Sequence, residues 1–274
     1  MLYTKQESDT ILGTLDKGLH VLIVLSEAPG SGLTLTELCA QVGMHRTTMF
    51  RILATLQTRD FVTRDEDSGR YQIGLRVLGL ASGLLRRLDI RQIARPVLQE
   101  LRQRTQELVY LTVLDHGEVV TVESFDSNQM ISLRADIGDR RPAYCSASGK
   151  AILAYLPEAE VDRILAAGMP ALTQRTITSP AVMHHHLAEI RSRGFAFDDE
   201  ERMEGLRCVA APIFNADGYA LGATSIAVPL MRAPWPRLHE LAHEITVAAS
   251  EISQQLGHVP ISTFDQDGHN RSVI

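Results

Sequence analysis

The chain contains few cysteines, and none of its 274 residues belongs to a long apolar run. The three cysteines, Cys39, Cys145 and Cys208, lie far apart and lack the spacing of a metal site. The length and ordinary composition exclude a disulfide-framed miniprotein, and the odd number and wide spacing of the cysteines predict reduced thiols in a cytosolic protein. No stretch approaches the roughly 18 consecutive apolar residues of a membrane span, and residues 1–10 lack the apolar core of a secretion signal. We therefore expect a cytoplasmic protein with no membrane partner.

The sequence also lacks the usual marks of a catalytic or metal centre. It contains no Walker-type phosphate loop. His184, His185 and His186 are adjacent, and adjacent side chains on a helix point about 100° apart, so they cannot easily share one ion. Cys145 lies near Lys150, but no general base with its orienting group accompanies it. We expect no catalytic residue, no metal and no cofactor.

An excess of positive charge is missing from the chain as a whole. The 27 Lys and Arg residues against 33 Asp and Glu residues give a net charge of −6, which argues mildly against a protein that coats nucleic acid. The distribution is uneven, since residues 1–87 hold ten basic and nine acidic residues. Within residues 45–87 there are eight arginines and four acids. Such a basic segment on an acidic protein indicates an anionic partner for that segment.

Apolar periodicity predicts two helices near the N-terminus. Residues 11–25 place leucines at three- and four-residue spacing, which makes one apolar stripe. Residues 34–42 restart the pattern, and Thr34 with Glu37 has the form of a capping box at the helix start. Gly43 follows, where a sharp turn can use a positive φ.

A third helix over residues 46–59 completes a helix-turn-helix pattern. Residues 61–73 then alternate by twos around a polar tip, which predicts a short hairpin and so a winged helix-turn-helix. In that motif the second helix presents its polar face to the major groove, while hairpin arginines follow the phosphates or enter the minor groove. The candidate DNA-contacting residues are His45, Arg46, Thr47, Thr48, Phe50 and Arg51 on the helix, and Arg64 and Arg70 on the hairpin. The pattern alone equally fits an ordinary helical hairpin with a solvated basic face.

The rest of the chain mixes helices and strands. Further helices are expected over residues 75–87, 89–106, 146–156, 157–167, 179–193 and 234–256. Strands are expected over residues 108–115, 118–125, 130–138, 208–215 and 219–228. The helix at 75–87 is apolar over more than one face, so we expect it to pack against another chain or domain. Pro96 can kink the helix that follows.

The segments LDKGLHVLIVL, LTLTELCAQVGMHRTTMFRILATLQTRDFV and GRYQIGLRVLGLA resemble the DNA-binding domain of IclR-family bacterial transcriptional regulators. This family usually has a Ser-Thr pair at the start of its recognition helix, where this chain has Thr47-Thr48, and the following arginine is matched by Arg51. His45 and Arg46 fall where the family varies, so they are candidates for choosing the DNA sequence.

The resemblance continues to about residue 256, through IGDRRPAYCSASGKAILAYLP, TQRTIT and IRSRGFAFDDEERMEGLRCVAAPIFNADGYALGATSIAVP. It implies an α+β protein with a winged helix-turn-helix DNA-binding domain over 1–73, a linker helix over 74–88 and a GAF-like effector-binding domain over 89–257. Residues 258–274 are polar and are predicted to form an unstructured tail.

The resemblance also implies a small-molecule cavity in the C-terminal domain. Its lining would comprise Ala147, Ser148, Asp198, Leu206, Cys208 and Ser225, with Met130 or Leu133 of the third strand as an apolar wall. Each residue also has a purely structural interpretation: a small buried hydrophobe for Cys208, a loop cap for Asp198, a bonded strand residue for Ser225, and helix-start packing for Ala147 and Ser148. Arg140 and Arg141 could neutralise an acidic effector, although we expect them on the surface.

The function implied is a ligand-responsive regulator, a repressor of a catabolic operon that a small organic-acid-like metabolite releases. Its partners would be a palindromic double-stranded DNA operator, that effector, and further copies of the chain in a homodimer or a dimer of dimers. The alternative from another class is a metabolite-binding or small-acid-processing enzyme whose N-terminal helices serve dimerisation.

Overall fold

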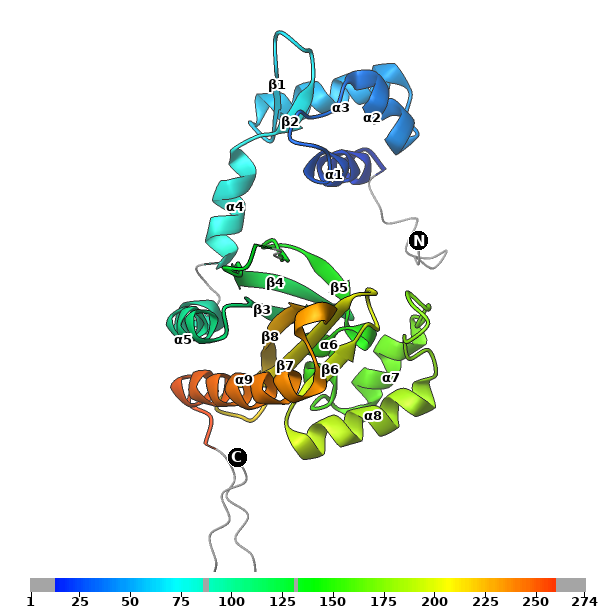
Figure 1. Ribbon diagram of the computed structural model, residues 1–274. Helices are drawn as coiled ribbons and strands as arrows, with labels where there is room; N and C mark the ends of the chain where they lie inside the picture. Colours follow the sequence, from blue (N-terminus) through cyan, green and yellow to red (C-terminus); the bar gives the residue numbers. More distant parts are fainter. Residues whose placement is uncertain (1–12, 86–88, 131–132, 260–274) are drawn as a thin grey trace, which may run out of the picture. The chain divides into compact units, whose positions relative to one another are not determined.

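The computed structural model describes residues 13–85, 89–130 and 133–259. The chain separates into two compact units, Met1–Arg87 and Leu88–Ile274, which we describe one at a time (Figure 1). The predicted tail therefore lies outside the described residues beyond residue 259, as do the last three residues of the predicted linker helix. None of the helices in the described ranges is both long enough and apolar enough to cross a membrane.

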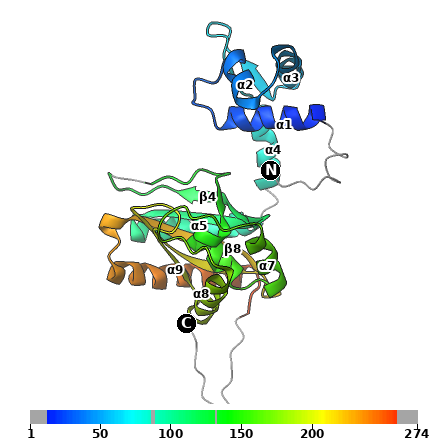
Figure 2. The same cartoon turned by 90° about the vertical axis from the view of Figure 1, so that its right-hand side faces the viewer.

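The N-terminal unit has the predicted winged helix-turn-helix order. Its elements are α1 (Gly13–Ser26), α2 (Leu35–Val42), α3 (Arg46–Thr58), β1 (Val62–Arg64), β2 (Tyr71–Ile73) and α4 (Arg76–Leu85). The two strands pair antiparallel with Thr63 opposite Gln72, and the tip of this hairpin extends beyond the helices (Figure 2). The core of the unit comprises Val21, Leu25, Leu33, Leu38, Met49, Ile52, Leu53, Val62 and Tyr71.

The turn between α2 and α3 follows from local chemistry. The Thr34 backbone N–H donates to the Glu37 carboxylate over 2.7 Å, and the Thr34 hydroxyl oxygen accepts from the Glu37 N–H, which completes the capping box. Gly43 ends α2 with φ 68°, a left-handed conformation that suits glycine. The Met44 N–H then donates to the Cys39 carbonyl. The chain therefore changes direction within a few residues, and α3 begins at Arg46.

The C-terminal unit is built on one antiparallel sheet with strand order β5-β4-β3-β8-β7-β6. In chain order the strands are β3 (Leu108–Asp115), β4 (Glu118–Phe125), β5 (Arg140–Pro142), β6 (Ala196–Asp199), β7 (Leu206–Phe214) and β8 (Ala220–Pro229). The α+β fold class is confirmed, but two strand predictions need correction. The strand expected over 130–138 is absent from residues 133–138, and its place at the sheet edge is taken by the shorter β5. Strand β6 was not predicted.

Helices cover both faces of this sheet. Helices α5 (Asp89–Thr105) and α9 (Trp235–Gln255) pack on one face, and α5 continues through Pro96. The other face carries the 3-10 turn η1 (Ala143–Cys145), α6 (Ala147–Leu153), α7 (Glu158–Ala166) and α8 (Pro180–Arg193) (Figure 1). Because side chains alternate along a strand, Val209 and Ile226 fall on the face opposite Cys208 and Ala227.

Candidate functional sites

The exposed face of α3 carries the candidate DNA-contacting residues. Thr47, Phe50, Arg51 and Ala54 follow one another at three- and four-residue spacing, and all four are exposed. Phe50 is 57% exposed, so this face combines an aromatic ring with hydroxyl and guanidinium groups. The face is therefore accessible to a partner and carries the kinds of side chain that the predicted DNA contacts need.

The start of α3 adds further polar side chains. His45 occupies the N-cap position without making a side-chain capping bond, so its imidazole is available. Arg46 is exposed, and Thr48 is half-buried. Among the described residues, neither Arg46 nor Arg51 has a carboxylate within ion-pair distance. Two unpaired guanidinium groups, one at the start of α3 and one on its exposed side, suit the phosphates or base edges of DNA.

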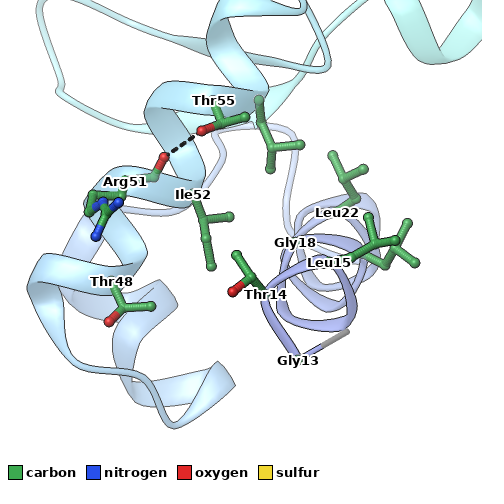
Figure 3. A pocket seen from close by; sticks show the side chains of 11 residues that line it. Gly13, Thr14, Leu15, Gly18, Leu22, Thr48, Arg51, Ile52 and Thr55 are labelled. Atoms are coloured by element: carbon green, nitrogen blue, oxygen red, sulfur yellow. Dashed lines mark hydrogen bonds between the residues drawn. The ribbon is translucent and has the colours of Figure 1, made fainter. Parts of the chain in front are cut away.

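A groove of about 660 Å³ separates α3 from α1 (Figure 3). Leu15, Leu19 and Leu22 line it from α1, and Ile52 points into it from α3. Thr48 and Arg51 line the α3 side, where the Thr55 hydroxyl donates to the Arg51 carbonyl over 2.9 Å. Arg51 therefore stands between an apolar groove and the exposed polar face.

The two hairpin arginines differ in their surroundings. Arg64 is exposed, and its guanidinium lies 5.6 Å from the centre of the Tyr71 ring. Arg70 is half-buried and donates to the Gly32 carbonyl over 2.7 Å and to the Glu37 carboxylate over 3.2 Å. The bonds from Thr34, and secondarily Arg70, lower the pKa of the Glu37 carboxyl. The guanidinium of Arg70 thus holds the start of α2, and the predicted phosphate contact would compete with these bonds.

The second candidate site lies on the α6 face of the C-terminal sheet. Strand register places Asp198, Cys208, Ala227 and Leu108 side by side in one row across four strands. The next row along the same face is Ala196, Ala210, Ser225 and Tyr110. Small residues dominate these rows, and they leave space above the sheet beneath the start of α6.

That space is a cavity of about 90 Å³. It is lined by Leu108, Tyr110, Leu133, Arg134, Arg141, Ser146, Asp198, Arg202, Met203, Leu206, Cys208 and Ala227. Of the residues predicted to line a pocket, the structure brings Leu133, Asp198, Leu206 and Cys208 to this cavity. Ala147, Ser148 and Ser225 are buried in the same layer but do not line it.

Met130 does not belong to this site. Its side chain is fully exposed, because β4 ends at Phe125 and, within the described residues, no strand carries residue 130 back over the sheet. Of the two alternatives for the apolar wall, the structure brings Leu133 to the cavity, where it is half-buried, and leaves Met130 outside it.

Burial sets the protonation of the cavity residues. It raises the pKa of Asp198 to about 6, although the nearby Lys150 ammonium and backbone N–H bonds oppose the shift. Burial also raises the pKa of the Cys208 thiol to about 12 and that of the Tyr110 phenol above its usual range. Both groups are therefore neutral at physiological pH and offer hydrogen bonds rather than charge.

Arg141 is a lining residue that the sequence analysis expected on the surface. It is only 7% exposed, and its guanidinium lies 4.8 Å from the centre of the Tyr110 ring. Arg140 fits the surface expectation, since it is exposed and pairs with Asp115 and Glu118 at 2.7 Å each. The two neighbours thus point to opposite sides of β5, as residues in a strand must.

A buried ion pair lies behind the cavity. Lys150 of α6 is completely buried and bonds to the carboxylate of Glu201, which is itself largely buried. The Glu201 N–H donates to Asp198 over 2.8 Å, and the Glu201 carbonyl accepts from the Thr176 hydroxyl over 2.6 Å. The Thr-rich segment around residue 176 thereby fixes the turn after β6, and Lys150 links this turn to α6.

Sequence reasoning missed this ion pair, although Gly149 is a local signal for it. A Cβ at position 149 would lie 2.2 Å from the Ala143 carbonyl oxygen, so only glycine permits α6 to pack this closely on η1. That close approach carries the next residue, Lys150, into the interior. Lysine is rarely buried without a partner, so the need for Glu201 follows once the burial is known.

The remaining signals have structural explanations. His184 bonds to Asp162 over 2.7 Å and His185 lies 3.4 Å from Glu189, while His186 lies 3.4 Å from the Lys150 ammonium. Burial and the Lys150 charge lower the pKa of His186 to about 4. The described residues contain no group of three or more potential ligands that could hold a metal ion. Burial raises the pKa of the Cys145 thiol to about 12, which does not suit a nucleophile.

Known proteins resemble both units. Residues 14–66 match the model of the IclR helix-turn-helix domain, and residues 82–254 match that of the bacterial transcriptional regulator IclR C-terminal region. The transcriptional repressor IclR of Escherichia coli K12 and the acetate operon repressor of Salmonella typhimurium are each 34% identical, over 89% of this chain and 90% of theirs. The crystal structure of the Thermotoga maritima IclR is 32% identical with a TM-score of 0.76, and the match covers 90% of this chain and all of that one.

Proposed function

The chain belongs to the IclR family of bacterial transcriptional regulators, and from this premise we propose that it represses a catabolic operon until a small organic acid binds its C-terminal cavity. Family members bind DNA and respond to small-molecule effectors, so the chain is a regulator and not an enzyme. The observation that carries the proposal is the pairing of an exposed, unpaired basic helix face with an arginine-lined cavity. The relative named as the acetate operon repressor agrees with a repressor of a catabolic operon.

We propose that His45, Arg46, Thr47, Thr48, Phe50 and Arg51 contact DNA. Arg46 and Arg51 would read base edges or phosphates, the threonine hydroxyls would bind phosphates, and Phe50 would contact a thymine methyl group. Because this target is chromosomal DNA, the site of action would be the cytoplasm.

We propose a homodimer, or a dimer of dimers, on a palindromic operator. Leu75, Leu78 and Leu80, in and just before α4, are 85%, 64% and 60% exposed, and Leu15 and Leu19 of α1 are also exposed. A monomeric protein rarely leaves so many large apolar residues of one small unit in water. Two-fold symmetry would place two α3 helices on half-sites about one helical turn apart, or a multiple of that.

The proposed function predicts ligand-sensitive binding to the DNA upstream of the chain's own gene. In fluorescence anisotropy, the full chain should bind this DNA with a Kd of roughly 10 nM or tighter at physiological salt. Glycolate, lactate or another short acid from a panel should weaken binding, since an effector shifts occupancy by its differential affinity for the two states. The control is the same DNA with its palindrome scrambled. Equal affinity for the two DNAs, with and without the acids, would contradict the proposal.

The hairpin provides a matched pair of variants. Arg64→Ala should weaken binding to all DNA sequences by a similar factor and reduce the salt slope by about 1, because one phosphate contact is lost. Arg70→Ala should leave that slope unchanged but lower the free energy of unfolding by about 1 kcal/mol, because it breaks half-buried bonds to Gly32 and Glu37. Salt-dependent anisotropy and urea unfolding measure the two effects. A lower slope for Arg70→Ala would contradict its assignment to the start of α2.

A further inference from the structure

Arg141 carries a charge that its surroundings do not balance. The residue is more than nine-tenths buried, and its Nε is buried without any hydrogen-bond partner. Among the described residues, the only hydrogen bond of its guanidinium is from Nη2 to the neutral Thr121 hydroxyl. In the same described part of the chain, no carboxylate lies within ion-pair distance of the guanidinium. An arginine cannot shed its proton to escape this environment.

Such an arrangement is costly for the free protein. Burying an ion without a partner loses its hydration, and the positive charge cannot be neutralised as a lysine or a carboxyl can be. The Tyr110 ring, 4.8 Å from the guanidinium, offsets part of this cost by its negative face. An anion in the cavity would offset the rest and would accept bonds from the guanidinium.

The cavity as a whole favours an anion. Its lining contains three arginines, Arg134, Arg141 and Arg202, and one acid, Asp198, among the described residues. The phenol of Tyr110 and the thiol of Cys208 add neutral polar groups between Arg141 and Asp198, with 4.0 Å from the phenol oxygen to Sγ. Arg141 and Asp198 thus lie on opposite sides of two neutral groups, and Arg202 follows Asp198 in the turn after β6.

Asp198 limits what the rest of the ligand can be. A second carboxylate next to Asp198 would be repelled, whereas a hydroxyl could donate to it. Asp198 already accepts from the Glu201 N–H and retains further acceptor capacity. The volume of about 90 Å³ is far below the roughly 300–1,000 Å³ of pockets for drug-sized ligands, so it suits a small molecule.

We infer that Arg141 is the anion anchor of this cavity and that the effector is a short hydroxycarboxylate, its carboxylate on Arg141 and its hydroxyl toward Asp198. The inference rests on the proposed function in that it takes the cavity to be the effector site. Arg141 and Asp198 come from β5 and β6, which are the two outer strands of the sheet, so a ligand that contacts both would join the two edges. A guanidinium binds a carboxylate through two parallel N–H bonds, which also fixes the orientation of the hydroxyl.

The alternative is that Arg141 is a structural cation that only packs on Tyr110. The two roles predict different effects of removing Arg141 on the stability of the protein without ligand. If Arg141 awaits an anion, Arg141→Met removes an unbalanced buried charge at little cost in volume, so the melting temperature without ligand should stay the same or rise. If Arg141 is structural, that variant should melt at a lower temperature.

The experiment uses the full chain and four probes: glycolate, lactate, glycerate and the uncharged lactamide. Calorimetric titration should show that at least one of the acids binds and that lactamide does not. Arg141→Met should weaken that binding by about tenfold or more, because a charge-assisted bidentate contact is lost. Arg140→Met is the matched control, since the neighbouring side chain is exposed and paired elsewhere, and it should bind within about twofold of the unsubstituted chain.

Operator binding is measured on the same samples to separate this inference from the proposed function. Arg141→Met should bind DNA as the unsubstituted chain does, but acid should no longer release it. Comparable binding of lactamide, undiminished acid binding by Arg141→Met, a lower melting temperature for that variant, or no acid binding to a chain that binds its operator would each overturn the inference. A chain that binds acid through Arg141 but no operator would instead contradict the proposed function alone.

Discussion

The double variant Arg46→Ala, Arg51→Ala should lose specific operator binding while keeping its fold and its oligomeric state. Both side chains are exposed and lack an ion-pair partner within the described residues, so their removal takes nothing from the core. A good arginine contact to a base contributes about 1–3 kcal/mol. Losing two such contacts should therefore weaken binding by about 30-fold or more. Anisotropy titration against the upstream DNA measures this loss.

Arg59→Ala is the control for that variant. Arg59 is also exposed but lies at the C-cap of α3, away from the end that we propose to enter the major groove. It should bind DNA within about threefold of the unsubstituted chain. Sedimentation and thermal melting should be unchanged in all three proteins. Full operator affinity in the double variant would show that α3 does not contact the DNA as proposed.

The largest expected effect on stability is that of Lys150→Met. This change leaves the Glu201 and Asp198 carboxyls buried without their cation, and one oxygen of Glu201 already lacks a hydrogen-bond partner. Breaking one side of a buried ion pair costs about 3–5 kcal/mol. We expect urea unfolding of the C-terminal unit to show a loss of that size at neutral pH.

The loss should depend on pH in a definite direction. Burial raises the pKa of both Asp198 and Glu201, and in the unsubstituted chain Lys150 opposes the shift. Without Lys150 the folded chain binds protons that the unfolded chain releases, so its stability falls as pH rises through the folded pKa values. The deficit of Lys150→Met should therefore be larger near pH 8 than near pH 5.

Two further variants test the cause. Lys150→Met combined with Glu201→Gln should recover part of the stability, since one uncompensated charge disappears. Arg175→Met breaks a much more exposed ion pair with Asp199 and should cost no more than about 1 kcal/mol. If Lys150→Met were no more harmful than Arg175→Met, the buried pair would not hold α6 to the turn after β6.

Periodicity predicted most elements of this fold because their patterns are local. The helices α1, α2, α3 and α9 and the hairpin β1–β2 were expected within a few residues of their observed bounds. Strands β5 and β6 contain only three and four residues, too few for a pattern, and pairing with a neighbouring strand defines them instead. The strand expected over 130–138 was wrong for the described residues 133–138, because apolar alternation alone does not provide the neighbouring strand that a sheet requires.

The site residues also divide into those that a local pattern predicts and those whose position depends on residues distant in the sequence. The α3 face could be predicted because one helix presents all of it. Arg70 could not, since its partner Glu37 lies 33 positions earlier. Arg141 was expected in solvent because arginines are mostly exposed, and its burial depends on Tyr110 and Thr121 on two other strands. Such pairings over long separations leave no mark in a short window of sequence.

The strand order of the C-terminal sheet also has a consequence during synthesis. The core of the N-terminal unit is closed by residues 21–71, so this unit can fold as soon as it emerges, as N-terminal domains generally do. Strand β3 must wait for β8, because Thr112 pairs with Ala223, more than a hundred residues later. The strands that line the cavity are complete only when nearly the whole chain has been synthesised. A nascent or interrupted chain would therefore carry its DNA-binding unit before it could sense any ligand.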